Sequence, residues 1–201
     1  MASEIEYALM AGRAYQENRA DINRFPVLSG WLPRRHEYDG AAGFEAISFI
    51  NGTDIANSTE IVISFAGTDE LVDWFANGGL AFGFATDQLK QAALYYLQVR
   101  EINPGATISF TGHSLGGGLA ALMGVMFDRP ATTFDPAPFR ASANNDIRQA
   151  IREHLAATLN PATGLPLLPW LRGCVFGTAR GRTTKVGAGE TANDGAWRMA
   201  A

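Results

Sequence analysis

The residues whose types and spacing most clearly suggest chemistry lie in the segment ISFTGHSLGGGLAALMG, residues 108–124. Gly112 stands two positions before Ser114, and Gly116 stands two positions after it. Glycine lacks the Cβ atom that would clash in a tight strand-to-helix turn, so this spacing allows a sharp turn around the serine. The pattern predicts that Ser114 projects alone from the apex, where its hydroxyl could act as a nucleophile. The alternative is a glycine-eased turn that carries a serine without a chemical role.

The sequence on both sides of Ser114 fits such a turn. A β-branched run predicts a strand over Thr107–Thr111, and an apolar pattern predicts a helix over Leu115–Phe127. The first N–H groups of a helix lack partners within the helix and carry partial positive charge. We therefore expect the Leu115 amide to donate a hydrogen bond to an oxyanion that forms beside Ser114.

The elements that must position this turn alternate between strand and helix patterns. Ser3 and Glu6 have the spacing of a capping box, which predicts an N-terminal helix. Residues 23–43, rich in Pro, Gly and charge, predict an irregular surface segment. The residues expected on one face of the first helix are Ile5, Ala8, Leu9 and Gly12. The other expected elements are strands at Phe44–Ile50, Ile61–Ala66 and Thr132–Phe134, and helices at Ala85–Glu101 and Asn144–Leu159. This alternation predicts an α/β fold with a mainly parallel sheet covered on both faces.

The pattern is lost from Pro161 onwards. We expect one domain over residues 1–171 and an irregular tail, rich in Gly, Ala and Arg, over residues 172–201. This loss leaves a C-terminal truncation of the fold as an open alternative. Cys174 is the only cysteine, so no internal disulfide is possible, and we expect it to be an inert packing residue.

Composition narrows the class of partner. The chain has 201 residues, with 47% hydrophobic and 18% charged residues, which is typical of one globular domain. A net charge of −4, without a Lys/Arg stripe, argues against a nucleic-acid partner and for a small uncharged substrate. The N-terminus lacks the pattern of a secretory signal and no stretch is apolar enough to span a membrane, so we expect a cytoplasmic protein or one exported by a signal outside this chain.

Several short motifs resemble the class 3 lipases of the α/β-hydrolase superfamily. They are TGHSLGG at 111–117, VISFAGTD at 62–69 with Asp73-Trp74 after it, and TTFDPAPF at 132–139. The resemblance covers residues 47–139 and is strongest to lipase-like domains that open large bacterial calcium-repeat exoproteins. It implies a three-layer α/β-hydrolase-type fold and places Thr68 in the oxyanion hole. Without the family, Thr68 would be a turn or helix-cap residue.

The acid and the base are less clearly marked. Asp135 directly follows the strand after the Ser114 helix, whereas the superfamily more often places its acid one strand later. Some lipases of the pancreatic type use this earlier position, so Asp135 is either the acid or a residue that shapes the pocket rim or caps a turn. Of His36, His113 and His154, only His154 satisfies the chain order Ser, acid, His. The competing explanation is that His154 packs on a helix and that the family's Asp and His lie beyond this chain.

These residues favour a serine hydrolase that cleaves carboxylic esters, as a lipase or esterase, through an acyl-enzyme. The reaction needs no cofactor, and no acidic loop has calcium-binding spacing, so neither a cofactor nor a metal is expected. Trp74–Asp87 could be a mobile lid or a packed loop. A phospholipase or cutinase-like variant would differ only in substrate shape. The rival from another class is a catalytically silent or truncated lipase-like module that acts as a binding or structural domain.

Overall fold

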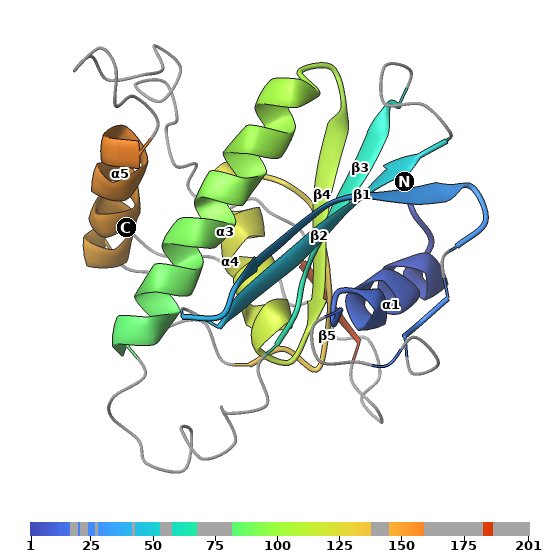
Figure 1. Cartoon of the computed structure of the whole chain (residues 1–201), viewed down its shortest axis with the longest axis horizontal. Helices are drawn as coiled ribbons and strands as arrows, with labels where there is room; N and C mark the ends of the chain where they lie inside the picture. The colour runs from blue at the N-terminus through green and yellow to red at the C-terminus, as the bar shows by residue number, and fades with distance from the viewer. Residues whose placement is uncertain are drawn as a thin grey trace.

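A computed structural model describes residues 1–16, 20, 24–26, 28–41, 43–52, 58–67, 82–137, 145–158 and 183–186 (Figure 1). In chain order its elements are α1 (Glu4–Arg13), β1 (Trp31–Asp39), β2 (Phe44–Asn51), β3 (Glu60–Phe65), α3 (Phe82–Ile102), β4 (Thr107–His113), α4 (Leu115–Phe127), β5 (Ala131–Phe134), α5 (Asn145–Thr158) and β6 (Thr183–Val186). The strands and helices predicted between residues 44 and 159 are confirmed to within three residues at each end.

The sheet joins its strands in the order β1-β2-β3-β4-β5-β6. β1, β2 and β3 pair antiparallel, whereas β3, β4, β5 and β6 run parallel, with helices in the connections. The register aligns Phe65 of β3 with Gly112 of β4, and His113 of β4 with Phe134 of β5. The carboxyl ends of three parallel strands therefore meet at one edge of the sheet, which is where α/β proteins place their sites.

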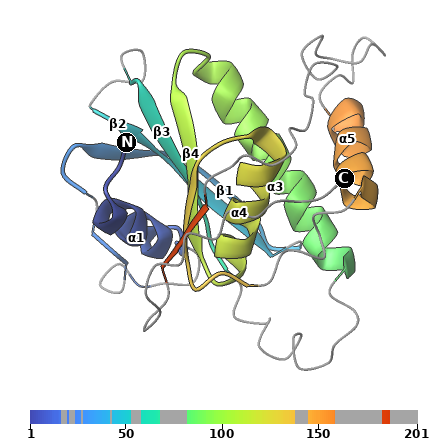
Figure 2. The same cartoon turned by 180° about the vertical axis from the view of Figure 1, so that it is seen from behind.

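Helices cover both faces of the sheet. α1 lies on one face, whereas α3 and α4 lie on the other, with α5 outside α3 (Figures 1 and 2). The larger apolar cluster fills the space between the sheet and α3, α4 and α5, and a smaller one lies beneath α1. This arrangement confirms the predicted three-layer α/β-hydrolase-type fold with a mainly parallel sheet.

The capping box of α1 is confirmed, and the residues that this helix buries are not those expected to share one apolar face. Glu6 N–H donates to Ser3 Oγ over 3.4 Å, and Ser3 N–H donates to Glu6 Oε2 over 2.6 Å. Ile5 is 74% exposed, and the buried residues are Tyr7, Met10 and Ala11. Tyr7 and Met10 bring larger side chains to the sheet than the predicted Ala8 and Gly12 do, so they bury more surface.

The segment predicted to be irregular contains the strand β1. Among the described strands, β1 pairs with β2 alone and lies at the edge of the sheet. Its register shifts between Pro33 and His36. An edge strand tolerates a proline and charged side chains because one side of its backbone needs no partner in the sheet. Pro, Gly and charge therefore masked the strand in the sequence.

Four residues of the C-terminal segment, Thr183–Val186, form β6 and pair with β5. So short a strand carries no recognisable periodicity. The other residues after Thr158, including Cys174, lie outside the described ranges, and the division at residue 171 stays a prediction.

Candidate active site

The predicted strand-to-helix turn is confirmed. β4 ends at His113 and α4 begins at Leu115, and Ser114 between them has φ 55° and ψ −125°. Residues other than glycine rarely adopt this conformation, because Cβ is crowded by the backbone there. The Ser114 side chain is half-buried and makes no capping hydrogen bond to α4. Its hydroxyl therefore does not cap the start of α4.

The two glycines of the motif are required by close contacts between backbone segments. A Cβ atom on Gly112 would lie 2.4 Å from the carbonyl carbon and oxygen of Gly116. A Cβ atom on Gly116 would lie 2.1 Å from the carbonyl oxygen of Phe65 on β3. No side chain fits at either position without moving the backbone, as the sequence predicted.

Backbone hydrogen bonds join Ser114 to the residues that follow β5. Ser114 N–H donates to Phe134 O over 3.1 Å, and Ala137 N–H donates to Ser114 O over 2.8 Å. Asp135, between these two partners, is exposed and has φ 44°. The structure thus brings Asp135 next to the Ser114 turn, as expected from parallel strands, while its role as the acid stays a prediction.

The end of β3 lies against the same turn. A Cβ atom on Gly67 would lie 3.2 Å from the carbonyl oxygen of His113 and 3.4 Å from the amide nitrogen of Leu115. Leu115 is the first residue of α4, where amides point out of the helix. Thr68 itself lies outside the described residues. Its neighbour Gly67 is adjacent to the Leu115 amide, and both oxyanion-hole roles stay predictions.

His154 lies on α5, which packs against α3. Burial lowers the pKa of His154 below its ordinary value of 6.5, the positive charge of Lys90 lowers it further, and Asp87 opposes the shift. Both of these charged residues belong to α3. The structure therefore places His154 beside α3, and its role as the base stays a prediction.

The other two histidines have partners elsewhere. His36 Nε2 lies 2.8 Å from Glu45 Oε1, between β1 and β2. His113 Nδ1 lies 3.2 Å from the hydroxyl oxygen of Tyr15.

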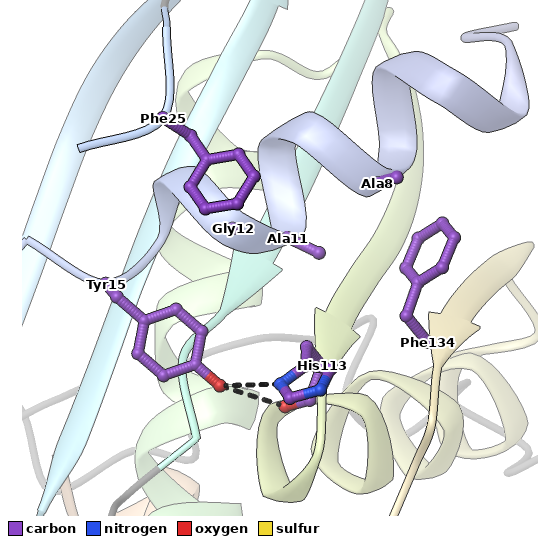
Figure 3. Close-up of a pocket in the computed structure, with 7 residues that line it drawn as sticks. All are labelled: Ala8, Ala11, Gly12, Tyr15, Phe25, His113 and Phe134. Carbon is purple, nitrogen blue, oxygen red and sulfur yellow. Dashed lines mark hydrogen bonds between the residues drawn. The ribbon is translucent and has the colours of Figure 1, made fainter. Parts of the chain in front are cut away.

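Tyr15 is a residue of this region that no sequence pattern predicted. Figure 3 shows its hydroxyl directed at the ring and the carbonyl of His113, next to Ser114 in the chain. The two residues border a largely apolar cavity of about 400 Å³ between α1 and the ends of β4 and β5. The other residues that line the cavity are Ala8, Ala11, Gly12, Phe25 and Phe134. Tyr15 and His113 are 98 positions apart, so no local periodicity could have paired them.

The structure describes only the later part of the proposed lid. Trp74–Ala81 lies outside the described ranges, whereas the residues from Phe82 onwards belong to α3. Asp73 and Phe139, which belong to the lipase-like motifs, also lie outside these ranges. Within the described ranges, no three His, Cys, Asp or Glu side chains gather in positions that could hold a metal ion. In the same ranges, no helix has the length and apolar character needed to cross a membrane.

Comparison with known families identifies the family of this chain. The family model of a Tle-like phospholipase domain, described as phospholipase-like, matches residues 7–160. This chain belongs to the Tle-like phospholipase family. The match includes β3, the Ser114 turn and the segment after β5, so the resemblance to lipases is confirmed at the level of the family.

Curated relatives of this Tle-like phospholipase domain are longer proteins. The extracellular phospholipase A1 of Serratia liquefaciens is 33% identical over 136 residues, which are 65% of this chain and 40% of the relative. A putative lipase, atg15, of Penicillium rubens is 45% identical over 53 residues, 26% of this chain and 8% of the relative. The domain therefore spans less than half the length of the relatives that it matches.

Solved lipase structures resemble this chain at lower sequence identity than the curated relatives do. A triacylglycerol lipase from Penicillium expansum has a TM-score of 0.48 at 13% identity, over 91% of this chain and 67% of that chain. Lipase II from Rhizopus niveus has a TM-score of 0.49 at 14% identity, over 73% of this chain and 66% of that chain. Similarity at this level does not bear on the substrate.

Proposed function

We propose that this Tle-like phospholipase domain is a serine hydrolase that cleaves carboxylic ester bonds of lipids, with Ser114 as the nucleophile. The observation that carries the proposal is the backbone of Ser114, held at φ 55° and ψ −125° between β4 and α4. Such strain costs about 1–3 kcal/mol, and it persists only where surrounding contacts impose it. A serine without a function at this position would be replaced by glycine at no steric cost.

The reaction begins when Ser114 Oγ attacks the acyl carbon and its proton passes to a base. The carbonyl oxygen becomes an oxyanion, which accepts hydrogen bonds from the amides of Leu115 and Thr68. The C–O bond to the alcohol then breaks, the base returns the proton to the leaving oxygen, and the acyl group stays on Ser114. Water activated by the same base attacks this acyl-enzyme and releases the fatty acid.

His154 is the proposed base, and Asp135 is the proposed acid that orients it. The position of Asp135 beside the Ser114 backbone supports its part of this assignment. A neutral imidazole is the form that accepts a proton, and the lowered pKa of His154 favours that form near neutral pH. In the structure His154 lies on α5, beside Lys90 and Asp87 of α3.

The substrate class that we propose is a phospholipid, attacked at an acyl ester. The family is phospholipase-like, and the Serratia relative is named an extracellular phospholipase A1. A negatively charged chain is compatible with a zwitterionic headgroup and repels a strongly anionic surface.

A lipase-like binding module without hydrolytic activity is the second candidate. The observation in its favour is the position of His154, beside Lys90 and Asp87 of α3. A nucleophile without a base would leave Ser114 structurally strained but chemically weak. This candidate and the hydrolase predict opposite results in the same assay.

The test measures release of a chromogenic alcohol from a butyrate ester and of fatty acid from phosphatidylcholine vesicles. We expect Ser114→Ala to lower kcat about a thousandfold or more, as loss of a serine nucleophile does. Ser58→Ala is the matched control, because its hydroxyl donates to Glu60 O at the opposite end of β3, and we expect turnover within about twofold of wild type.

The outcomes separate the candidates. Activity above that of Ser114→Ala, on vesicles as well as on butyrate, would support a phospholipase. Activity on butyrate alone would contradict the phospholipid substrate. A wild-type chain no more active than Ser114→Ala would overturn the hydrolase in favour of the binding module. His154→Ala assigns the base, because unchanged turnover in that variant would place the base elsewhere.

A further inference from the structure

Tyr15 lies where three separate segments of the chain meet. It follows α1, and its hydroxyl contacts the turn at His113 as well as the space beside Gly67 at the end of β3. The partly buried Tyr15 packs against the smaller apolar cluster beneath α1, whereas His113 is exposed. Apolar packing therefore accounts for the ring of Tyr15 but not for the direction of its hydroxyl.

The first contact restrains the peptide that precedes Ser114. Tyr15 Oη donates to the carbonyl oxygen of His113 over 3.3 Å. The N–H of the same peptide, that of Ser114, donates to Phe134 O over 3.1 Å. Because a peptide group is planar, hydrogen bonds at its two ends fix its orientation, and this orientation sets φ of Ser114. The strained φ of Ser114 is thus held from the α1 side and from the β5 side.

The second contact joins the Tyr15 hydroxyl to the ring of His113. A tyrosine hydroxyl has one hydrogen to donate and can also accept hydrogen bonds. If that hydrogen is donated to the His113 carbonyl, the contact of 3.2 Å with Nδ1 requires a proton on Nδ1, which then donates to Tyr15 Oη. One hydroxyl is then hydrogen-bonded to both the carbonyl oxygen and Nδ1 of His113.

The third contact explains the glycine at the end of β3. A Cβ atom on Gly67 would lie 2.8 Å from Tyr15 Oη, so the hydroxyl occupies the space that a side chain would take. The same Cβ position is 3.4 Å from the Leu115 amide nitrogen. The space beside Gly67 is therefore bordered by the Tyr15 hydroxyl and by the proposed oxyanion donor.

We infer that Tyr15 is a positioning residue for the hydrolytic site: its hydroxyl holds the peptide before Ser114 and sets the spacing between the turn and the end of β3. The inference rests on the proposed hydrolase function. Tyr15 acts through the backbone and has no part in bond making, so its removal weakens the alignment of Ser114 with the oxyanion donors.

The experiment compares Tyr15→Phe with Tyr7→Phe in the purified chain. Tyr7 is the matched control, because its hydroxyl also reaches from α1 to β4, donating to Ser109 Oγ over 2.9 Å in the buried part of the sheet. We expect Tyr15→Phe to lower kcat on the butyrate ester about threefold to tenfold, the range of one lost hydrogen bond, with KM within twofold of wild type. We expect Tyr7→Phe to lower Tm at least as much while leaving kcat unchanged.

A double-variant cycle locates the effect at Gly67. Gly67→Ala displaces the Tyr15 hydroxyl, so we expect it to lower kcat in the wild-type background by at least the same factor. In the Tyr15→Phe background the hydroxyl oxygen 2.8 Å from the new Cβ atom is absent, so Gly67→Ala should lower kcat by a smaller factor than it does in the wild type. Additive losses would contradict the contact as the cause.

The results distinguish this inference from the proposed function. An inactive wild-type chain would overturn the hydrolase and the inference with it. A chain with Ser114-dependent activity in which Tyr15→Phe keeps the wild-type kcat would overturn the inference alone. Equal losses of kcat in Tyr15→Phe and Tyr7→Phe would also overturn it, because a general loosening of α1 would then explain both.

Discussion

The body of the sheet and its carboxyl edge are held together in different ways. In the body, aromatic side chains fill the space, and the ring of Phe110 lies 6.0 Å from that of Phe65 and 5.3 Å from that of Tyr96. At the carboxyl edge, formed by Gly67, Gly112, Ser114 and Gly116, backbone meets backbone with no room for a Cβ atom on two of the glycines.

This difference means that the body of the sheet mainly determines the stability of the fold, whereas the carboxyl edge mainly determines the geometry of the site. Buried aromatic rings stabilise the fold in proportion to the area that they remove from water, and a core absorbs a modest change in shape by repacking. Contacts between backbone segments have no rotamers to adjust. One added methyl group at the carboxyl edge should therefore cost more than a change of several atoms in the body.

Gly116→Ala gives the largest expected effect. Its Cβ atom would lie 2.1 Å from Phe65 O, and only movement of β3 or α4 could relieve the clash. We expect a loss of about 4 kcal/mol or more in the free energy of unfolding, seen as insoluble protein or a much lower urea midpoint. Gly105→Ala is the control, because nothing lies within 4 Å of its Cβ position, and its stability should stay within about 0.5 kcal/mol of wild type. Equal urea midpoints for the two variants would contradict the view that the carboxyl edge has no room for an added methyl group.

Phe110→Leu changes the body and leaves the carboxyl edge intact. Phe110 is fully buried, and the replacement keeps an apolar side chain of similar reach. We expect a loss of about 1 kcal/mol in the free energy of unfolding, measured by urea titration, and an unchanged kcat for the folded enzyme. A large fall in kcat with little loss of stability would contradict the separation of body from edge.

His154 gives the smallest expected effect and tests which region it belongs to. Because its pKa is lowered in the folded protein, the unfolded chain binds more protons at pH values between the folded pKa and 6.5. The free energy of unfolding should therefore fall as pH drops through about 6.5. At higher pH the contribution of His154 to it should not change. We expect the difference in Tm between wild type and His154→Gln to shift against the wild type between about pH 8 and pH 5. A difference that does not change with pH would contradict the burial of His154 between α5 and α3, which is the main cause of its lowered pKa.

The turn around Ser114 could be predicted because its requirements are local. A glycine two residues to either side, a β-branched run before and an apolar helix after it are all visible within residues 108–124. The position of Asp135 next to the turn followed from the logic of neighbouring parallel strands. β1 was missed because an edge strand tolerates Pro33 and charged residues that a central strand excludes.

Other features depended on contacts that no local pattern contains. The face of α1 that packs on the sheet could not be predicted, since helical spacing alone did not show that Tyr7 would contact Ser109. His154 was selected by chain order, and its position on α5 beside α3 is a consequence of helix packing. The roles of Thr68, Asp135 and His154 stay predictions.

The amino-acid sequence by itself determined that a serine sits on a tight strand-to-helix turn, because backbone sterics at Gly112 and Gly116 act within a few residues. Only the tertiary structure decided that Tyr15 supports this turn and that Gly67 leaves room for its hydroxyl. The physical reason is distance along the chain: Tyr15 and His113 are 98 residues apart, and they meet only because α1 packs across the sheet.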